Sequence, residues 1–354
     1  MLKCLICIIL SAYTVYGLPN DINKIKEMYQ KPSQYWEKPF VDTYIIYEEL
    51  APLPKIPPFP KDNPYTKSKA QLGEKLFNDP ILSLSGQISC ANCHKKEFAY
   101  SDNKKVSYGH NHQKGKRKSP SLIMSGFGKE KLRDGRAKNL EEQVLFPIKD
   151  PKEMALNLDL LLQRLNHMPK YQKEFQAVFG KPTITLQAIT QAIATYERTL
   201  LPNPTRFDQF LQGSKNALND EEIWGLHLFR TKARCMNCHY GISLSDQKYH
   251  NLGLTYYGRK YEDLGRYEVT KNPQDIGSFK TPSLRQISRT SPYMHNGLFP
   301  TIRGILNAYN AGMFHPKPLP NQNNLFFPKT SPLLQKLNLN PDEIKAIEAF
   351  LKTL

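Results

Sequence analysis

The chain has 354 residues, a formal net charge of +17 and 27 prolines. Its length suits two domains of ordinary size, and its prolines suit long ordered loops around a ligand. The basic residues are scattered, apart from a cluster at Lys114–Lys118, and a basic surface can steer an acidic partner. Nucleic acid is not the expected partner, because the N-terminal residues direct the chain out of the cytoplasm.

Residues 1–17 have the features of a secretory signal peptide. Lys3 precedes an apolar run, Leu5–Leu10, which is too short to span a bilayer. Cys4 and Cys7 lie inside this segment and leave with it on cleavage. We therefore expect export to the periplasm or an equivalent compartment, with an uncleaved N-terminal anchor as the alternative.

Residues 18–65 are polar and rich in proline, with five prolines between Pro52 and Pro60. This composition predicts an extended N-terminal arm that runs over the surface. The sequence assigns no chemistry to it.

One five-residue pattern occurs twice, as Cys-Ala-Asn-Cys-His at Cys90–His94 and as Cys-Met-Asn-Cys-His at Cys235–His239. A Cys-x-x-Cys-His run is the attachment signature of a c-type haem, because each thiol forms a thioether to a vinyl group and the histidine binds the iron. Two matches in an exported chain predict two covalently bound haems c, with tetrahedral zinc as the alternative. The expected attachment residues are Cys90, Cys93, Cys235 and Cys238, and the expected proximal ligands are His94 and His239. All cysteines beyond the leader are then used, so no disulfide is expected, and the haem propionates offset part of the positive charge.

Each haem motif lies between two segments of matching sequence. Gly73–Phe77 precedes the first motif and Gly225–Phe229 the second, and the closing segments are Ala192–Leu200 and Ala346–Leu354. Apolar residues recur in them at helical spacing. A glycine on the opening helix allows the closing helix to cross closely, which is typical of cytochrome c domains.

This internal repeat predicts a mainly α-helical fold of two cytochrome c-like haem domains with long loops. The first domain is expected at about residues 66–212 and the second at 213–354. Two unrelated amphipathic helices are the alternative, which the shared order of the segments disfavours.

Further ordered matches run from about Pro64 to the C-terminus. They include Gly109-His110, Asp134–Ala137, Gln143, Pro147, Glu153-Met154, Glu197–Leu200, His250–Gly253, Lys280–Arg285 and Pro292–Gly297. On these residues the sequence resembles the bacterial di-haem cytochrome c peroxidases and their MauG-type relatives.

This resemblance implies that the first haem is peroxidatic and that the second transfers electrons to it. Peroxide needs an open iron position and an acid-base group that moves a proton from its inner to its outer oxygen. The resemblance gives this role to Glu153 and places Gln143 and Pro147 in the same distal pocket. A solvated surface carboxylate is the alternative interpretation of Glu153.

The resemblance also gives His110 a role as the distal histidine that caps the peroxidatic iron in many resting oxidised relatives. This histidine has to leave before peroxide binds, and in those relatives reduction of the second haem triggers a loop rearrangement. His112 is close enough in sequence to compete for the role.

The sequence leaves two kinds of sixth ligand for the second haem, a phenolate oxygen and a thioether sulfur. The run Leu306–Met313 resembles the tyrosine-bearing segment of the MauG group, which makes Tyr309 the first candidate, with Met313 and Met294 as alternatives. Thioether sulfur raises the potential and suits electron uptake, whereas phenolate oxygen stabilises highly oxidised iron. A packed aromatic ring is the remaining interpretation of Tyr309.

Two residues depart from the family pattern. Arg133 stands where relatives usually carry a tryptophan between the haems, and Lys118 stands where they carry the asparagine ligand of an inter-haem calcium. An ammonium group cannot ligate Ca²⁺ but can replace its charge, so calcium is doubtful here.

The function expected from the resemblance is a periplasmic di-haem peroxidase that reduces hydrogen peroxide to water. A small soluble cytochrome c or a cupredoxin is the expected electron donor, and a homodimer is possible because relatives are often dimers. The alternatives are a MauG-type oxidase that modifies a protein or a small organic substrate, and a di-haem electron carrier without enzymatic activity.

Overall fold

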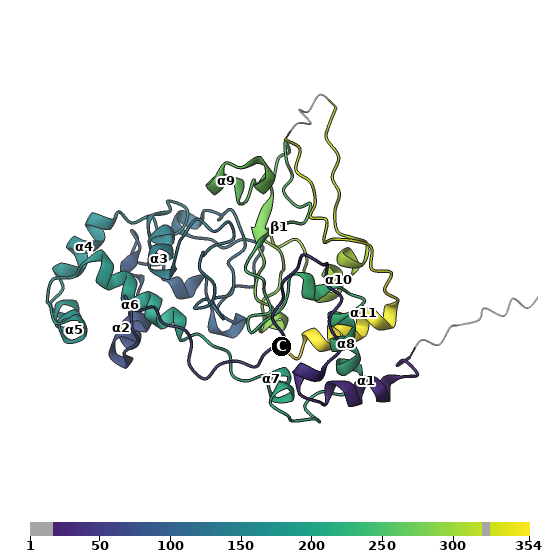
Figure 1. The fold of residues 1–354 in the computed structure, drawn as a ribbon. Coiled ribbons are helices and arrows are strands. Elements are labelled where there is room, and N and C mark those ends of the chain that lie inside the picture. Colours follow the sequence, from purple (N-terminus) through teal and green to yellow (C-terminus); the bar gives the residue numbers. More distant parts are fainter. Residues whose placement is uncertain (1–16, 321–325) are drawn as a thin grey trace, which may run out of the picture.

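A computed structural model describes residues 17–320 and 326–354 of the chain (Figure 1). This part contains eleven α-helices and a single two-stranded sheet, which confirms the predicted mainly α-helical class. No helix within it is long and apolar enough to cross a membrane. Most of the predicted signal peptide, residues 1–16, lies outside the described residues.

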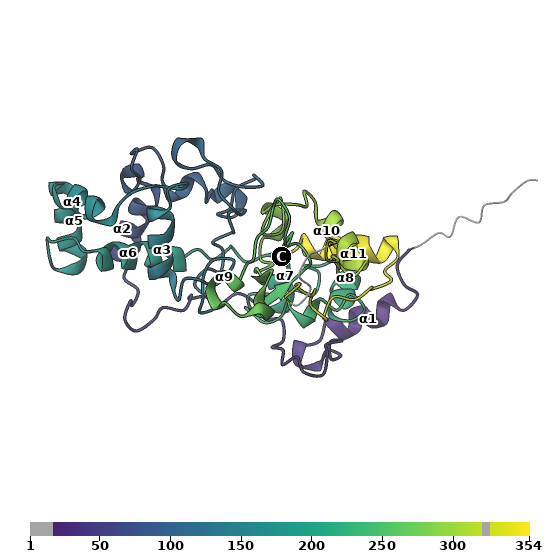
Figure 2. The ribbon, with the colours of Figure 1, turned by 90° about the horizontal axis from the view of Figure 1, so that it is seen from above.

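The helices gather on two sides of a loop-rich middle, in both views of the molecule (Figures 1 and 2). The first group comprises α2 (Lys67–Asn78), α3 (Leu140–Lys149), α4 (Leu158–Asn166), α5 (Pro169–Phe179) and α6 (Leu186–Arg198). The second comprises α1 (Ile22–Tyr29), α7 (Arg206–Leu211), α8 (Asp220–Arg230), α10 (Ile302–Asn310) and α11 (Pro341–Leu351). Each group encloses a hydrophobic core of its own.

The two predicted helix crossings are present, and glycine makes both possible. A Cβ atom on Gly73 of α2 would lie 1.9 Å from the carbonyl oxygen of Ala192 on α6. A Cβ atom on Gly225 of α8 would lie 2.0 Å from the carbonyl oxygen of Ala346 on α11. Because any side chain would separate the backbones, the glycine in each opening segment fixes the distance between the helices that flank its haem motif.

The N-terminal arm is not extended throughout. Ile22–Tyr29 form helix α1, which packs on α8 and buries Ile25 and Tyr29 in the second core. The Tyr29 hydroxyl lies 3.2 Å from Nδ1 of His227 on α8. Apolar residues at helical spacing explain this helix, although the polar and proline-rich composition of the whole arm conceals them.

A small hairpin stands between the two helix groups. Strands β1 (Tyr249–Asn251) and β2 (Ser278–Lys280) pair antiparallel, and the connection between them carries α9 (Tyr267–Thr270). The backbone N–H of Lys280 donates to the carbonyl oxygen of Arg133 at 2.8 Å. The hairpin thus ties the second half of the chain to the loop that precedes α3.

Candidate active site

Both haem-attachment motifs fold as short 3-10 turns, Cys90–Asn92 and Cys235–Asn237. In the first turn, the side-chain oxygen of Asn92 accepts from the backbone N–H of Ser89 at 2.8 Å. In the second, the side-chain amide of Asn237 donates at 3.0 Å to the carbonyl oxygen three residues earlier. The asparagine that the two motifs share therefore holds each turn closed.

Both motif histidines are oriented for binding through Nε2. Nδ1 of His94 lies 2.9 Å from the carbonyl oxygen of Tyr100, and Nδ1 of His239 lies 2.8 Å from that of Leu244. Because a carbonyl oxygen only accepts, Nδ1 carries the proton in each ring and the lone pair of Nε2 is left for a metal. Burial lowers the pKa of both imidazoles, which keeps them neutral.

Both motifs open onto one continuous cavity of about 880 Å³. Its walls are predominantly apolar, and they include the four motif cysteines and both motif histidines. Several buried polar atoms around it have no partner among the described residues, including Oε1 of Gln143 and Nε of Arg133. An apolar cavity that holds cysteine pairs, free imidazole nitrogens and unpaired polar groups fits two covalently bound haems.

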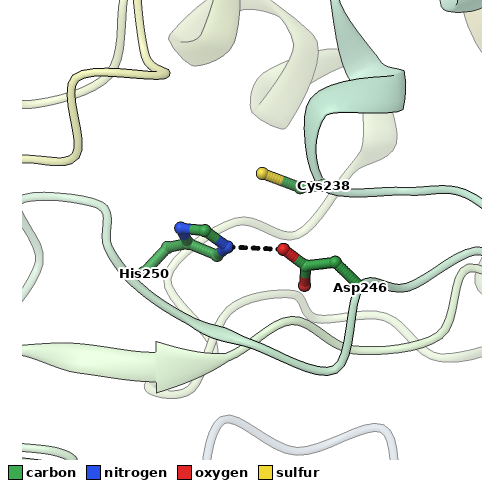
Figure 3. Close-up of side chains that lie close together, drawn as sticks. All are labelled: Cys238, Asp246 and His250. Carbon is green, nitrogen blue, oxygen red and sulfur yellow. Dashed lines mark hydrogen bonds and ion pairs between the residues drawn. The ribbon is translucent and has the colours of Figure 1, made fainter. Parts of the chain in front are cut away.

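Cys238, Asp246 and His250 lie together at the second motif, with ligating atoms within 4.8 Å of one another (Figure 3). Nε2 of His250 is 2.8 Å from a carboxylate oxygen of Asp246. A thioether bond from the Cys238 sulfur to a haem would remove the thiolate that a metal ion needs. The cluster is therefore an Asp–His pair at the haem attachment site.

The predicted distal residues of the first haem meet on one wall of the cavity. Gln143 and Pro147 lie one turn apart on α3, and Glu153 follows the end of that helix. Burial raises the pKa of the Glu153 carboxyl, the charge of Asp150 raises it further, and Arg136 opposes the rise. The cavity lining thus contains the Glu153 carboxyl, whose pKa is raised although the residue as a whole is exposed. It also contains the side-chain oxygen of Gln143, which has no hydrogen-bond partner among the described residues.

His110 lies directly behind this wall. Its backbone N–H donates to the carbonyl oxygen of Glu153 at 2.7 Å, and its Nδ1 is buried without a hydrogen-bond partner in the part of the chain that the structure describes. Gly109 packs so closely that a Cβ atom there would lie 2.2 Å from the carbonyl oxygen of Lys152. Gly109 lines the cavity while the ring of His110 does not, and His112 is exposed. Of the two histidines, His110 is the one held against Glu153.

Two of the three candidates for the sixth ligand of the second haem face the cavity. Tyr309, on α10, and Met294 are among the lining residues, whereas Met313 is buried but lies elsewhere. Burial raises the pKa of the Tyr309 phenol, with added contributions from Cys238 and Cys235, so its hydroxyl is close to the second motif. The structure places Tyr309 near the cysteines of the second motif, brings Met294 to the shared cavity, and leaves Met313 outside the cavity lining.

Lys118, which stands where the family resemblance implies an asparagine, is a buried cation. It is 2% exposed, and its ammonium group donates to Oγ of Ser101 at 3.0 Å and to a carboxylate oxygen of Asp102 at 3.1 Å. It also donates to the backbone carbonyl of Asp102. A lysine side chain thus sits among oxygen atoms of the kind that Ca²⁺ prefers.

Wild-type holoprotein is expected to contain no stoichiometric calcium after dialysis, because the Lys118 ammonium already neutralises Asp102. Turnover of peroxide should then be unaffected by a calcium chelator. Lys118→Asn leaves the Asp102 carboxylate buried without its cation, and this variant should bind calcium in a calorimetric titration. Lys114→Asn, at an exposed lysine of the same cluster, is the control. One equivalent of calcium in dialysed wild-type protein would contradict the expectation.

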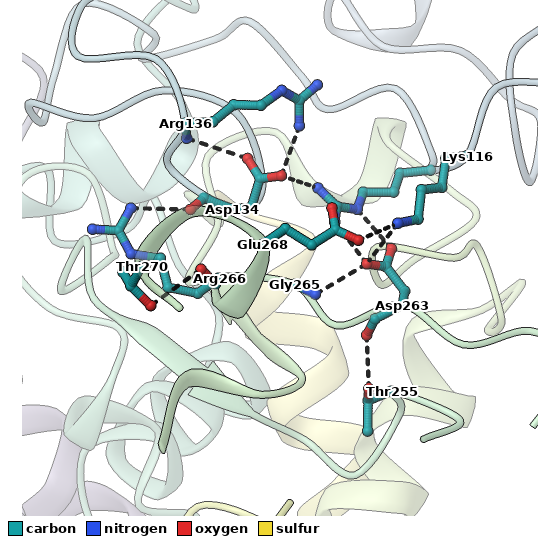
Figure 4. Close-up of polar contacts among 10 residues, drawn as sticks. Lys116, Asp134, Arg136, Thr255, Asp263, Gly265, Arg266, Glu268 and Thr270 are labelled. Carbon is teal, nitrogen blue, oxygen red and sulfur yellow. Dashed lines mark hydrogen bonds and ion pairs between the residues drawn. The ribbon is translucent and has the colours of Figure 1, made fainter. Parts of the chain in front are cut away.

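A network of ion pairs joins loops of the first half of the chain to the segment around α9, and no sequence pattern predicts it (Figure 4). Arg117 donates to both carboxylate oxygens of Asp263 at 2.6 Å and to Asp134 at 2.5 Å. Lys116 donates to Glu268 at 2.5 Å. The pairs with Asp263 and Glu268 join residues more than a hundred positions apart, and Asp134 lies 17 residues from Arg117. Apart from the short α9 that carries Glu268, these residues lie in loops without periodicity, so only the folded chain pairs them.

Glu197 is a second cavity carboxyl, and the sequence showed it only as part of a family match. It lies near the end of α6, and its Oε2 is buried without a hydrogen-bond partner. Burial raises the pKa of Glu197 to about 8, although Arg198 and Lys131 lower it in part. Glu197 therefore lines the cavity in its neutral form at pH 7.

Two c-type haem sites that share one cavity define a di-haem enzyme class, and comparison with known proteins agrees. Residues 67–216 match the family model of the di-haem cytochrome c peroxidases. The chain is 36% identical over 300 residues to the cytochrome c551 peroxidase of Nitrosomonas europaea, covering 84% of this chain and 83% of that protein. It is 33% identical over 299 residues to the methylamine utilization protein MauG of Methylophilus methylotrophus, covering 84% and 85%.

Among solved structures, the fold is similar to that of a MauG-like protein associated with microbial copper homeostasis. The TM-score is 0.75 at 32% sequence identity, over 85% of this chain and 94% of that one. The chain belongs to the di-haem cytochrome c peroxidase and MauG family. It carries two covalently bound haems c and is an oxidoreductase that acts on peroxide.

Proposed function

We propose that the chain is a periplasmic peroxidase that reduces hydrogen peroxide to water with electrons from a small soluble cytochrome c or a cupredoxin. Each H2O2 takes up two electrons and two protons and leaves as two waters. The bound haems supply the electron transfer and the site where peroxide reacts. The observation that carries the proposal is the wall of Glu153, Gln143 and Pro147 on the cavity beside the first motif.

Side chains of the protein accept and return the protons. The Glu153 carboxylate takes a proton from the inner oxygen of peroxide and returns it to the outer oxygen, which then leaves as water. The raised pKa of this carboxyl matches the task, because a base that is too weak would not accept the proton. The amide of Gln143 is placed to orient peroxide, and Pro147 keeps that turn of α3 without a competing N–H donor.

A peroxide titration of the holoprotein at defined reduction states tests this function. The expected result is that protein reduced by one electron or more consumes H2O2, one molecule per two electrons, and turns over with a reduced cytochrome or cupredoxin. Peroxide consumption whose rate does not depend on a reduced cytochrome or cupredoxin would overturn the peroxidase assignment. An absence of any reaction with peroxide would indicate an electron carrier instead.

A second candidate is a MauG-type oxidase, in which the oxidised protein takes two oxidising equivalents from peroxide and passes them to a protein or organic substrate. Tyr309 on the cavity favours it, because a phenolate ligand stabilises highly oxidised iron. Its signature in the same titration is a stoichiometric reaction of the fully oxidised protein with peroxide. His110 behind Glu153 favours the first candidate.

A further inference from the structure

Arg133 places a guanidinium group on the cavity wall where the two halves of the chain meet. Its carbonyl oxygen accepts from the backbone of Lys280 on β2, and its side chain lines the cavity. Nε is buried without a hydrogen-bond partner, and within residues 17–320 and 326–354 the guanidinium forms no ion pair. A buried charge without an anion is unfavourable, so the cavity has to supply one.

The neighbouring cations do not share this situation. Arg117 is paired with Asp134 and Asp263, and Lys118 is paired with Asp102. Burial and then the charge of Arg117 lower the pKa of Arg133 to about 10. Arg133 is thus the member of this cationic group for which the described residues provide no anion.

Five carboxyl groups line the cavity, and two of them, Asp150 and Glu153, form no bond to Arg133 within the described residues. The other three are engaged elsewhere or neutral. Glu130 is bonded to Arg266, and Glu268 to Lys116. Glu197 is neutral at pH 7, because burial raises its pKa to about 8. None of these three acids is free to neutralise Arg133.

We propose that Arg133 binds a propionate carboxylate of one of the two haems at the boundary between the domains. The haems bring the carboxylates that the cavity lacks, and a guanidinium binds a carboxylate through two parallel N–H donors. In relatives a tryptophan stands at this position, so the chain has a charged cofactor clamp in place of an aromatic ring between the haems. A neutralised propionate stabilises the ferric state less, and the clamp therefore raises the potential of the haem that it holds.

Spectroelectrochemical titration of the holoprotein tests this. Arg133→Met is expected to lower the midpoint potential of one haem, so that its ratio of reduced to oxidised form falls about tenfold at fixed ambient potential, a shift of about 59 mV. Arg133→Lys keeps the charge and should recover most of the potential. Arg259→Met removes the same charge from an exposed arginine outside the cavity and should change neither haem.

The haem whose potential shifts identifies the propionate that Arg133 holds. Potentials of Arg133→Met equal to those of Arg259→Met, for both haems, would overturn the proposal. Resonance Raman spectra of Arg133→Lys give a second test. This variant retains the charge, so the test does not depend on the stability of Arg133→Met. A propionate bending mode that is identical in Arg133→Lys and wild type would contradict a two-donor contact.

Discussion

The Glu153→Gln holoprotein is expected to lose peroxide turnover by about 10²–10⁴-fold, the range typical of an acid-base catalyst. The amide keeps the size of the side chain but neither accepts nor returns a proton. Because Glu153 lies on the cavity wall after the end of α3, the substitution leaves the helix and its cap at Asn139 intact. Haem content and the spectra of both haems should therefore match wild type.

The activity of wild type should also fall towards acid pH, beginning above the ordinary carboxyl value of 4.5, because burial raises the pKa of Glu153. The active form is the carboxylate, so protonation removes the base as pH drops through the raised pKa. This acid limb should be absent from the residual activity of Glu153→Gln.

Glu142→Gln is the matched control. Glu142 lies on the same helix α3, outside the cavity, and its carboxylate accepts from the backbone of Lys138 at 2.7 Å, which a glutamine oxygen also does. Its turnover should stay near that of wild type. Equal turnover of Glu153→Gln and Glu142→Gln would show that another group moves the proton, and Glu197 on the same cavity would be the next to test.

The sequence predicted those parts of the molecule that depend on local pattern. The two Cys-x-x-Cys-His runs predicted two haem sites. The glycine in each opening segment predicted the two helix crossings, because helix backbones cross closely only where one residue has no side chain. The family resemblance implied that Glu153 and Gln143 share a distal pocket, and both residues line the cavity.

The sequence did not predict contacts between distant loops. Lys118 and Asp102 are sixteen residues apart with no periodic pattern, and Arg117 pairs with Asp263, 146 residues further along the chain. Ion pairs of this kind depend on where the chain brings two loops, which no propensity or spacing encodes. The cavity that both motifs line was not predicted for the same reason, because it depends on how the two helix groups and the loops between them pack.

Tyr309→Phe is expected to change the spectrum of the second haem, on the proposal that the phenolate of Tyr309 is its sixth ligand. The ring still fills its place on α10, so the substitution removes the oxygen atom and little packing. Tyr309→Met offers a thioether instead, and the potential of this haem should rise by roughly 0.1 V or more, since axial ligands span about 0.8 V.

The raised pKa of Tyr309 keeps the phenol protonated until a metal binds it. Burial is its main cause, and the added influence of Cys238 and Cys235 disappears when both sulfurs are thioethers. A buried phenol ionises only beside a cation, and ferric iron supplies that cation in the same way that a coordinating metal deprotonates a thiol. The phenolate would thus exist only when the second haem is in place.

Met294→Leu separates the two candidates that face the cavity. If Tyr309 is the ligand, optical and electron paramagnetic resonance spectra of Met294→Leu match wild type while those of Tyr309→Phe change. The reverse pattern, together with a methionine-to-iron band in wild type, would assign the position to Met294 and leave Tyr309 as a packed ring. That outcome would also remove the observation that favours a MauG-type oxidase, since a thioether suits electron uptake from a small redox protein.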